Sequence, residues 1–157
     1  MKTERGFTLI ELVVTVAIIA VLASGLFPLV EISAKRAKEQ ELRSALREIR
    51  TAIDAYKQAV DEGKLAKDAT KPGYPPSLQD LVNGVTDQRS PTGQQIYFLR
   101  RLPRDPFAAE SKATAEETWG QRSYASPPDA PAPGVDVFDI YSLSSLKGLN
   151  GVPYKEW

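Results

Sequence analysis

The sequence predicts an α+β protein, in which a long N-terminal helix packs with its second half on a small C-terminal antiparallel sheet. Beyond an apolar start, apolar side chains recur at helical spacing and no turn signal appears until Gly63, which indicates one long helix. Near the other end, Val135–Ser142 alternates as a half-buried strand does. A chain of 157 residues therefore holds one modest domain beside the helix.

The apolar start covers Phe7–Val30, 24 residues with a single charged side chain, Glu11. As a helix it would be about 36 Å long, enough to cross a hydrocarbon layer of about 30 Å. We expect a transmembrane helix rather than a buried core helix, since a small domain has no interior wide enough for this run. The alternative is a secretory signal with Lys2 and Arg5 at its start and a cleavage site at Val21–Ala23. Glu11 argues against it, because a signal gains nothing from a carboxylate in an apolar helix.

A basic head, then Gly6, Phe7 and, four residues on, Glu11 precede the apolar run. This order resembles the processing site of type IV pilins and of the pseudopilins of type II secretion. The resemblance implies that an inner-membrane prepilin peptidase cuts between Gly6 and Phe7 and N-methylates Phe7. It also implies an assembly role for Glu11, and for Pro28, which falls where many members of the family carry a helix-kinking proline.

The resemblance divides the chain into a leader (1–6), a transmembrane and filament-core helix (7–30) and a periplasmic globular domain (31–157). It implies a single-pass inner-membrane protein with a cytoplasmic N-terminus, which later joins a periplasmic pseudopilus. Counting basic residues alone favours the opposite orientation, because more of them follow the helix than precede it. Those that follow are Lys35, Arg36, Lys38 and Arg43. We follow the resemblance, because Gly6 must face the peptidase.

Glu11 lies about one helical turn beyond Phe7, since residues four apart share a helix face. Cleavage would free a cationic amine on Phe7. In a filament, Glu11 would neutralise this amine on its own or on a neighbouring subunit. Because a buried charge without a partner is very costly, the pair would select the axial register of the subunits. The alternative is that Glu11 only extends to the membrane interface.

The amphipathic stretch predicts that the helix continues to about Glu62. Its apolar residues follow one another at steps of four and three, which places them on one face. They are Leu42, Leu46, Ile49, Ile53, Tyr56 and Val60. We expect this apolar stripe to pack on the C-terminal domain. The alternative is a coiled-coil seam, because the spacing is also close to 3.5 residues.

The C-terminal domain is expected to contain a short helix and a small sheet. Ser77–Val82 reads as the helix, with Ser77 as its N-cap. Residues 85–96 are expected to form an exposed loop. The strand candidates are Arg122–Ala125 and Val135–Ser142. We expect a sheet of about three or four strands to cover the apolar stripe.

Three later segments are similar to the major pseudopilins of type II secretion. Segment 98–107 has two basic residues, Leu, Pro and Asp-Pro before an aromatic residue, 119–124 contains an aromatic–glycine pair, and 138–143 resembles the C-terminal strand. Between the first two, 108–118 reads as an exposed insertion.

In the major pseudopilins a calcium loop follows that strand. Calcium prefers several oxygen ligands, usually including carboxylates. After position 142 this chain has one acid, Glu156, and the nearest other candidates are Asp136 and Asp139 upstream. We prefer the alternative that Tyr154 and Trp157 close the domain by packing.

The composition excludes several classes of function. The chain has no cysteine and no histidine, so it lacks disulfides, thiolate chemistry and histidine-based catalysis. Its 20 basic and 20 acidic residues balance, which gives no support for binding nucleic acid. The sequence has no phosphate loop, nucleophile motif or metal-ligand cluster, so we expect no enzymatic activity.

The resemblance implies a structural subunit of a type II secretion pseudopilus, which assembles through its N-terminal helix into a periplasmic fibre that helps to export folded proteins. The implied partners are further copies of itself, minor pseudopilins, the prepilin peptidase, and the inner-membrane platform and assembly ATPase of the secretion machinery. No cofactor is implied beyond calcium. One alternative is a type IV pilus subunit for adhesion, motility or DNA uptake. The other is a secreted binding domain behind an ordinary signal peptide.

Overall fold

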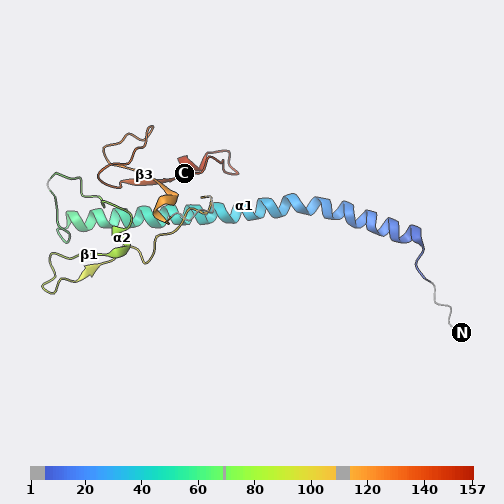
Figure 1. Cartoon of the computed structure of the whole chain (residues 1–157), viewed down its shortest axis with the longest axis horizontal. Coiled ribbons are helices and arrows are strands. Elements are labelled where there is room, and N and C mark those ends of the chain that lie inside the picture. The colour runs from blue at the N-terminus through green and yellow to red at the C-terminus, as the bar shows by residue number, and fades with distance from the viewer. Residues whose placement is uncertain (1–5, 69, 109–113) are drawn as a thin grey trace. The chain divides into compact units, whose positions relative to one another are not determined.

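The computed structural model describes residues 6–68, 70–108 and 114–157, without the side chains of 24–29. Its elements are α1 (Leu9–Asp61), α2 (Asp80–Asn83), β1 (Val85–Thr86), β2 (Gln95–Ile96), the 3-10 helix η1 (Glu116–Thr118), β3 (Trp119–Arg122), β4 (Asp139–Ser142) and the 3-10 helix η2 (Tyr154–Glu156) (Figure 1). The fold is therefore α+β, as predicted. The chain divides into two units, Met1–Ala37 and Lys38–Trp157, and each is described by itself.

The first unit contains the beginning of α1. This helix starts at Leu9, close to the predicted start at Phe7, and its backbone is assigned as helix through the segment that contains Pro28. The side chain of Pro28 lies outside the described residues, so the predicted kink stays a prediction.

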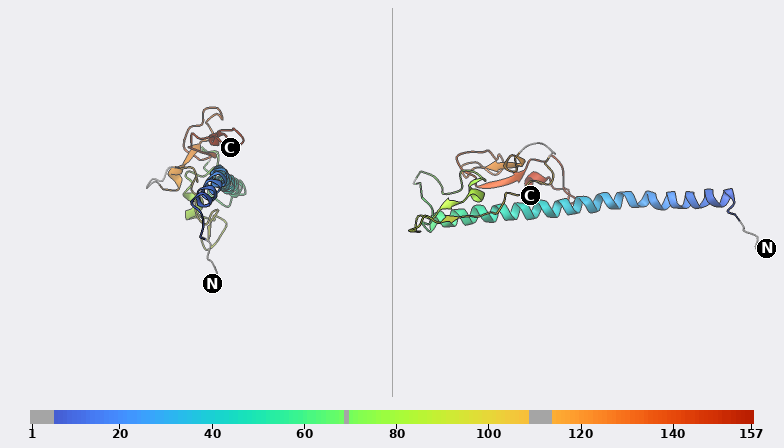
Figure 2. Two further views of the ribbon diagram at one scale, coloured as in Figure 1. Left: turned by 90° about the vertical axis from the view of Figure 1, so that its right-hand side faces the viewer. Right: turned by 60° about the horizontal axis from the view of Figure 1, so that its bottom comes forward.

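In the second unit the rest of the chain gathers along the second half of α1 (Figure 2). Each residue of the apolar stripe is at most 9% exposed, which confirms the predicted packing face. The stripe contacts a core from all later parts of the domain, and this core includes Leu78, Leu81, Leu99, Val137, Ile140 and Tyr154. Because burial of each large aliphatic side chain contributes about 1.5–3 kcal/mol, this contact is the main source of the domain's stability.

The helix ends where the sequence predicts. Gly63 has a φ of 71°, a left-handed conformation that glycine adopts without strain. The backbone N–H of Gly63 donates to Val60 and that of Lys64 to Ala59, both at 2.9 Å. These bonds satisfy carbonyls at the helix end, as in a Schellman motif.

The β structure differs from the prediction. It consists of two separate two-stranded sheets, so the expected single sheet of about three or four strands is wrong. β1 pairs antiparallel with β2, so residues 85–96 are not simply a loop. β3 pairs antiparallel with β4, and Trp119 lies opposite Ser142 in the register. Strands of two residues carry too few positions for a periodic signal in the sequence.

The predicted bounds of the second sheet are also wrong. β3 lies mostly before the predicted Arg122–Ala125, and β4 keeps only the end of Val135–Ser142. The buried carboxylate of Asp136 explains the difference, because it accepts hydrogen bonds from Ser123 Oγ at 2.6 Å and from Tyr124 N at 3.0 Å. A side chain therefore bonds this stretch where a strand ladder was expected.

The short helix α2 begins later than predicted, at Asp80 instead of Ser77. Ser77 nevertheless belongs to a capping arrangement. Its Oγ accepts from Asp80 N at 3.3 Å, and its own N–H donates to Asp80 Oδ2 at 3.1 Å. This reciprocal pair organises the turn before α2.

Part of the predicted insertion, 109–113, lies outside the described residues. The end of the insertion is not exposed as predicted. Thr118 is buried, and Glu116 Oε1 accepts a hydrogen bond from Leu78 N at 3.2 Å. This end is therefore part of the folded domain.

Candidate functional site

The N-terminus of α1 is held by a reciprocal pair of polar residues. Thr8 immediately precedes the helix, and its Oγ1 accepts from the backbone N–H of Glu11 at 3.3 Å. In return, Glu11 Oε2 accepts from the N–H and the hydroxyl of Thr8, both at 3.4 Å. This is a capping box, in which two unsatisfied helix donors are satisfied by side chains. This role of Thr8 and Glu11 was not predicted, although Thr-x-x-Glu before an apolar run signals it.

The two residues at the predicted cut lie before this cap. Gly6 and Phe7 have no helical conformation, and Phe7 is 84% exposed. A side-chain carbon added at Gly6 would meet no atom within 4 Å. The Gly6–Phe7 peptide bond therefore lies on an accessible segment of the chain. In this chain, Glu11 contacts Thr8. The predicted pairing of Glu11 with a freed Phe7 amine stays a prediction.

The first turns of α1 expose large apolar side chains on all sides. Of the residues from Leu9 to Leu22, ten aliphatic side chains are between 49% and 82% exposed. They are Leu9, Ile10, Leu12, Val13, Val14, Val16, Ile18, Ile19, Val21 and Leu22. Such a contiguous apolar surface is stable only when lipid or other apolar helices exclude water from it. In the part of the chain that the structure describes, none of the helices is both long and apolar enough to span a bilayer.

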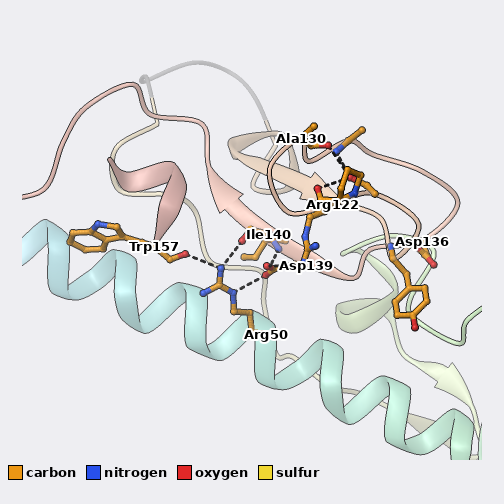
Figure 3. A network of polar contacts seen from close by, with 11 residues as sticks. Arg50, Arg122, Ala130, Asp136, Asp139, Ile140 and Trp157 are labelled. Carbon is orange, nitrogen blue, oxygen red and sulfur yellow. Dashed lines mark hydrogen bonds and ion pairs between the residues drawn. The ribbon is translucent and has the colours of Figure 1, made fainter. Parts of the chain in front are cut away.

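A polar cluster ties the second half of α1 to β4 (Figure 3). Arg50 Nε donates to Asp139 Oδ1 at 2.8 Å, and its Nη2 donates to the carbonyls of Ile140 at 3.0 Å and Trp157 at 2.9 Å. Arg122 on β3 lies 3.6 Å from the other oxygen of Asp139. One carboxylate thus joins the helix and both strands of the sheet. Charge-assisted bonds of this geometry fix orientation as well as adding stability.

The two candidate calcium ligands, Asp136 and Asp139, bind other groups of the protein. Asp139 lies between two guanidinium groups, and Asp136 holds the segment before β4. They do not point into a common site. Among the described residues, no three or more acidic side chains gather so that they could hold a metal ion.

The segment 98–107 that resembles the major pseudopilins has a structural use. Its buried Asp105 accepts from the backbone N–H of Phe107 at 2.7 Å and from the hydroxyl of Ser142 on β4. Its Pro103 carbonyl accepts from Trp119 Nε1 at 2.9 Å. The segment therefore joins the loop to both strands of the second sheet.

Tyr154 and Trp157 close the domain by aromatic packing, as predicted. Tyr154 is fully buried, and its ring stacks on that of Phe107 with centroids 4.1 Å apart. The rings of Tyr154 and Trp157 form a T-shaped pair with centroids 4.9 Å apart. The hydroxyl of Tyr154 donates to Glu39 on α1 at 3.0 Å. Burial, and then this hydrogen bond to Glu39, raise the pKa of Tyr154 to about 12.

We expect this shifted pKa to make the domain less stable in strong alkali. The unfolded chain loses the Tyr154 proton near pH 10, whereas the folded chain keeps it until about pH 12. The contribution is therefore fully present below pH 10 and is lost as the pH rises toward 12. Each proton difference lowers the unfolding free energy by about 1.4 kcal/mol per pH unit. Denaturant unfolding of the full chain in detergent, followed between these pH values, measures this slope.

Tyr154→Phe keeps the ring and removes the titrating hydroxyl. The fall of the unfolding free energy with pH is expected to be shallower in this variant. Part of this pH dependence should remain, because burial also raises the pKa of Tyr56 and Tyr74. An unchanged slope in Tyr154→Phe would contradict the assignment.

Comparison with known proteins gives two matches. The family model described as the prokaryotic N-terminal methylation motif matches residues 1–27. The type II secretion system core protein G of Klebsiella michiganensis is 28% identical over 142 residues, which cover 86% of this chain and 90% of that protein. No solved structure matches the chain. The first match covers the predicted cleavage site, the capping box and most of the exposed apolar helix, and the second extends over both units.

Proposed function

We propose that this chain, a pilin-like pseudopilin by its methylation motif and its similarity to a core protein G, is the structural subunit of a type II secretion pseudopilus. In this proposal it assembles through its N-terminal helix into a periplasmic fibre that helps to export folded proteins. The observation that carries the proposal is the capped start of α1, which is apolar apart from Glu11 and Thr15 and closely follows an accessible Gly6–Phe7 bond.

Processing comes first in this proposal. The prepilin peptidase cuts after Gly6 and N-methylates Phe7, and the new amine then lies about one turn from Glu11. The chain is anchored in the inner membrane by 7–30, with its N-terminus in the cytoplasm and its C-terminal domain in the periplasm. This segment supplies the apolar surface that requires a covering.

Assembly then exchanges one apolar environment for another. Helices of neighbouring subunits replace lipid around the exposed aliphatic side chains, so extraction from the bilayer costs little hydrophobic free energy. A repeated contact between different faces of identical subunits builds a fibre when its rotation does not close into a ring, and we propose the open arrangement here. The minor pseudopilins, the platform protein and the assembly ATPase act with the subunit in this step.

In this proposal the second unit, Lys38–Trp157, has a structural role. Its core, the Arg50–Asp139 cluster and the Asp105 contacts make a folded domain on the same helix. No catalytic step is assigned to it, in keeping with a structural family.

Deletion of the gene in the source bacterium tests the function. We expect proteins normally exported by type II secretion to remain in the periplasm, and the wild-type gene in trans to restore their export. Cell motility and DNA uptake are measured in the same strains. Normal export combined with a loss of motility or DNA uptake would contradict the proposal and assign the chain to a type IV pilus.

A further inference from the structure

The loop after β4 does not fit the calcium ion that the resemblance to the major pseudopilins implies. Between positions 143 and 153 the chain has no aspartate and no glutamate. Calcium takes about six to eight oxygen ligands and normally needs carboxylates among them. Of the two acids that flank the loop in sequence, Glu156 is exposed on η2, and Asp139 lies against Arg50 and Arg122, whose charges would oppose a cation.

The loop is instead tied to α1 by Glu39. This carboxylate is 8% exposed, and its Oε1 accepts from the backbone N–H of Leu149 at 2.7 Å and from the hydroxyl of Tyr154 at 3.0 Å. One bond holds the tip of the loop, and the other holds the residue where the loop ends. A buried carboxylate is costly without donors, so closing the loop and burying Glu39 are coupled.

The rest of the loop is organised by its own backbone and by the side chains of Ser144 and Asn150, which accept from Leu146 N and Val152 N. Gly148 N donates to Val152 O at 2.8 Å, and Gly151 N donates back to Gly148 O at 2.9 Å. Lys147 and Pro153 form an isolated bridge at the base of this turn. These bonds shape the turn itself, whereas the Glu39 carboxylate bonds it to the helix.

We propose that the Glu39 carboxylate takes the place of the calcium ion of the major pseudopilins, fastening the loop of residues 143–153 to α1 and making closure of this domain independent of calcium. The inference concerns the closure of one folded unit. It therefore holds whether or not the chain builds a secretion fibre.

Hydrogen–deuterium exchange of the full chain in detergent tests the proposal, with the peptide that covers the loop as the reporter. We expect wild-type exchange in this peptide to be the same with calcium chloride as with the chelator EGTA. Glu39→Gln is expected to exchange there about tenfold faster, because a neutral amide oxygen replaces the charged acceptor and weakens both of its hydrogen bonds. The matched control is Glu41→Gln, the same change at an exposed position of the same helix, which should exchange like wild type.

Two results would overturn the proposal. One is slower loop exchange in calcium, in wild type or in Glu39→Gln, which would reveal a cation site. The other is loop exchange in Glu39→Gln that equals that of Glu41→Gln. If Glu39→Gln does not fold, Tyr154→Phe replaces it, since this change keeps the ring and removes one of the two donors to Glu39. Faster loop exchange in Tyr154→Phe then supports the proposal, and unchanged exchange contradicts it.

Discussion

Glu11→Ala is expected to leave cleavage after Gly6 largely intact and to abolish fibre assembly. In the proposed fibre the carboxylate would be the partner of the cationic amine on Phe7. Removing one member of a buried ion pair costs about 3–5 kcal/mol, because the other charge stays buried without compensation. Each subunit addition would then become less favourable by more than about a hundredfold. Cleavage is measured from the mass of the chain, and assembly from fibres in electron micrographs of cells that overproduce the protein.

The capping box requires a matched pair of controls, because Glu11→Ala also removes a cap from α1. Glu11→Gln removes the charge but retains a side chain that can close a capping box. Thr8→Ala retains the charge and removes the cap, at a cost of about 0.5–2 kcal/mol. We expect Glu11→Gln to fail in assembly and Thr8→Ala to assemble with at most a reduced yield. Normal fibres from Glu11→Gln would show that capping, and not charge, is the role of this residue.

Gly6→Val is expected to stop processing, so that the full-length chain accumulates in the membrane and no fibres form. We expect this loss of processing because the peptidase, and not the folding of the chain, excludes a larger side chain. Among the described residues nothing opposes a side chain here, since an added Cβ meets no atom within 4 Å and Gly6 lies before the helix. The branched side chain instead obstructs the bond as the peptidase binds it.

Gly6→Val should therefore unfold at the same temperature as the unprocessed wild-type chain, which serves as the control for folding. Processing is followed in pulse-labelled cells, where Gly6→Ala, with its smaller side chain, is expected to be cut slowly. Cleavage of Gly6→Val at the wild-type rate would mean that the cut does not depend on this glycine. A mature chain that begins near Ser24 would instead identify an ordinary signal peptide.

The long helix and its buried face were predictable from the sequence, because periodicity over many turns is a strong signal. The steps between Leu42 and Val60 identify the face that the structure buries, and Gly63 marks its end. The sheets were less predictable. β1 and β2 have two residues each, and the carboxylate of Asp136 replaces strand pairing in a stretch whose alternation resembles a strand.

Some polar contacts could also be predicted from the sequence, whereas others could not. The Thr8–Glu11 cap is local, and its spacing could have been recognised in the sequence. Glu39 and Arg50 could not be singled out, because each is one charged residue among many on a helix. Their partners, Leu149 and Asp139, are 110 and 89 positions away in the chain. Only the packing of the loop and of β4 against α1 gives these two side chains their roles.

Prepilin processing is best tested by the intact mass and N-terminal sequence of the protein isolated from its native membrane. We expect a chain that begins at Phe7 and carries one added methyl group on its terminal nitrogen. A chain that keeps residues 1–6, begins elsewhere or has an unmodified amine would overturn the assignment as a processed pseudopilin.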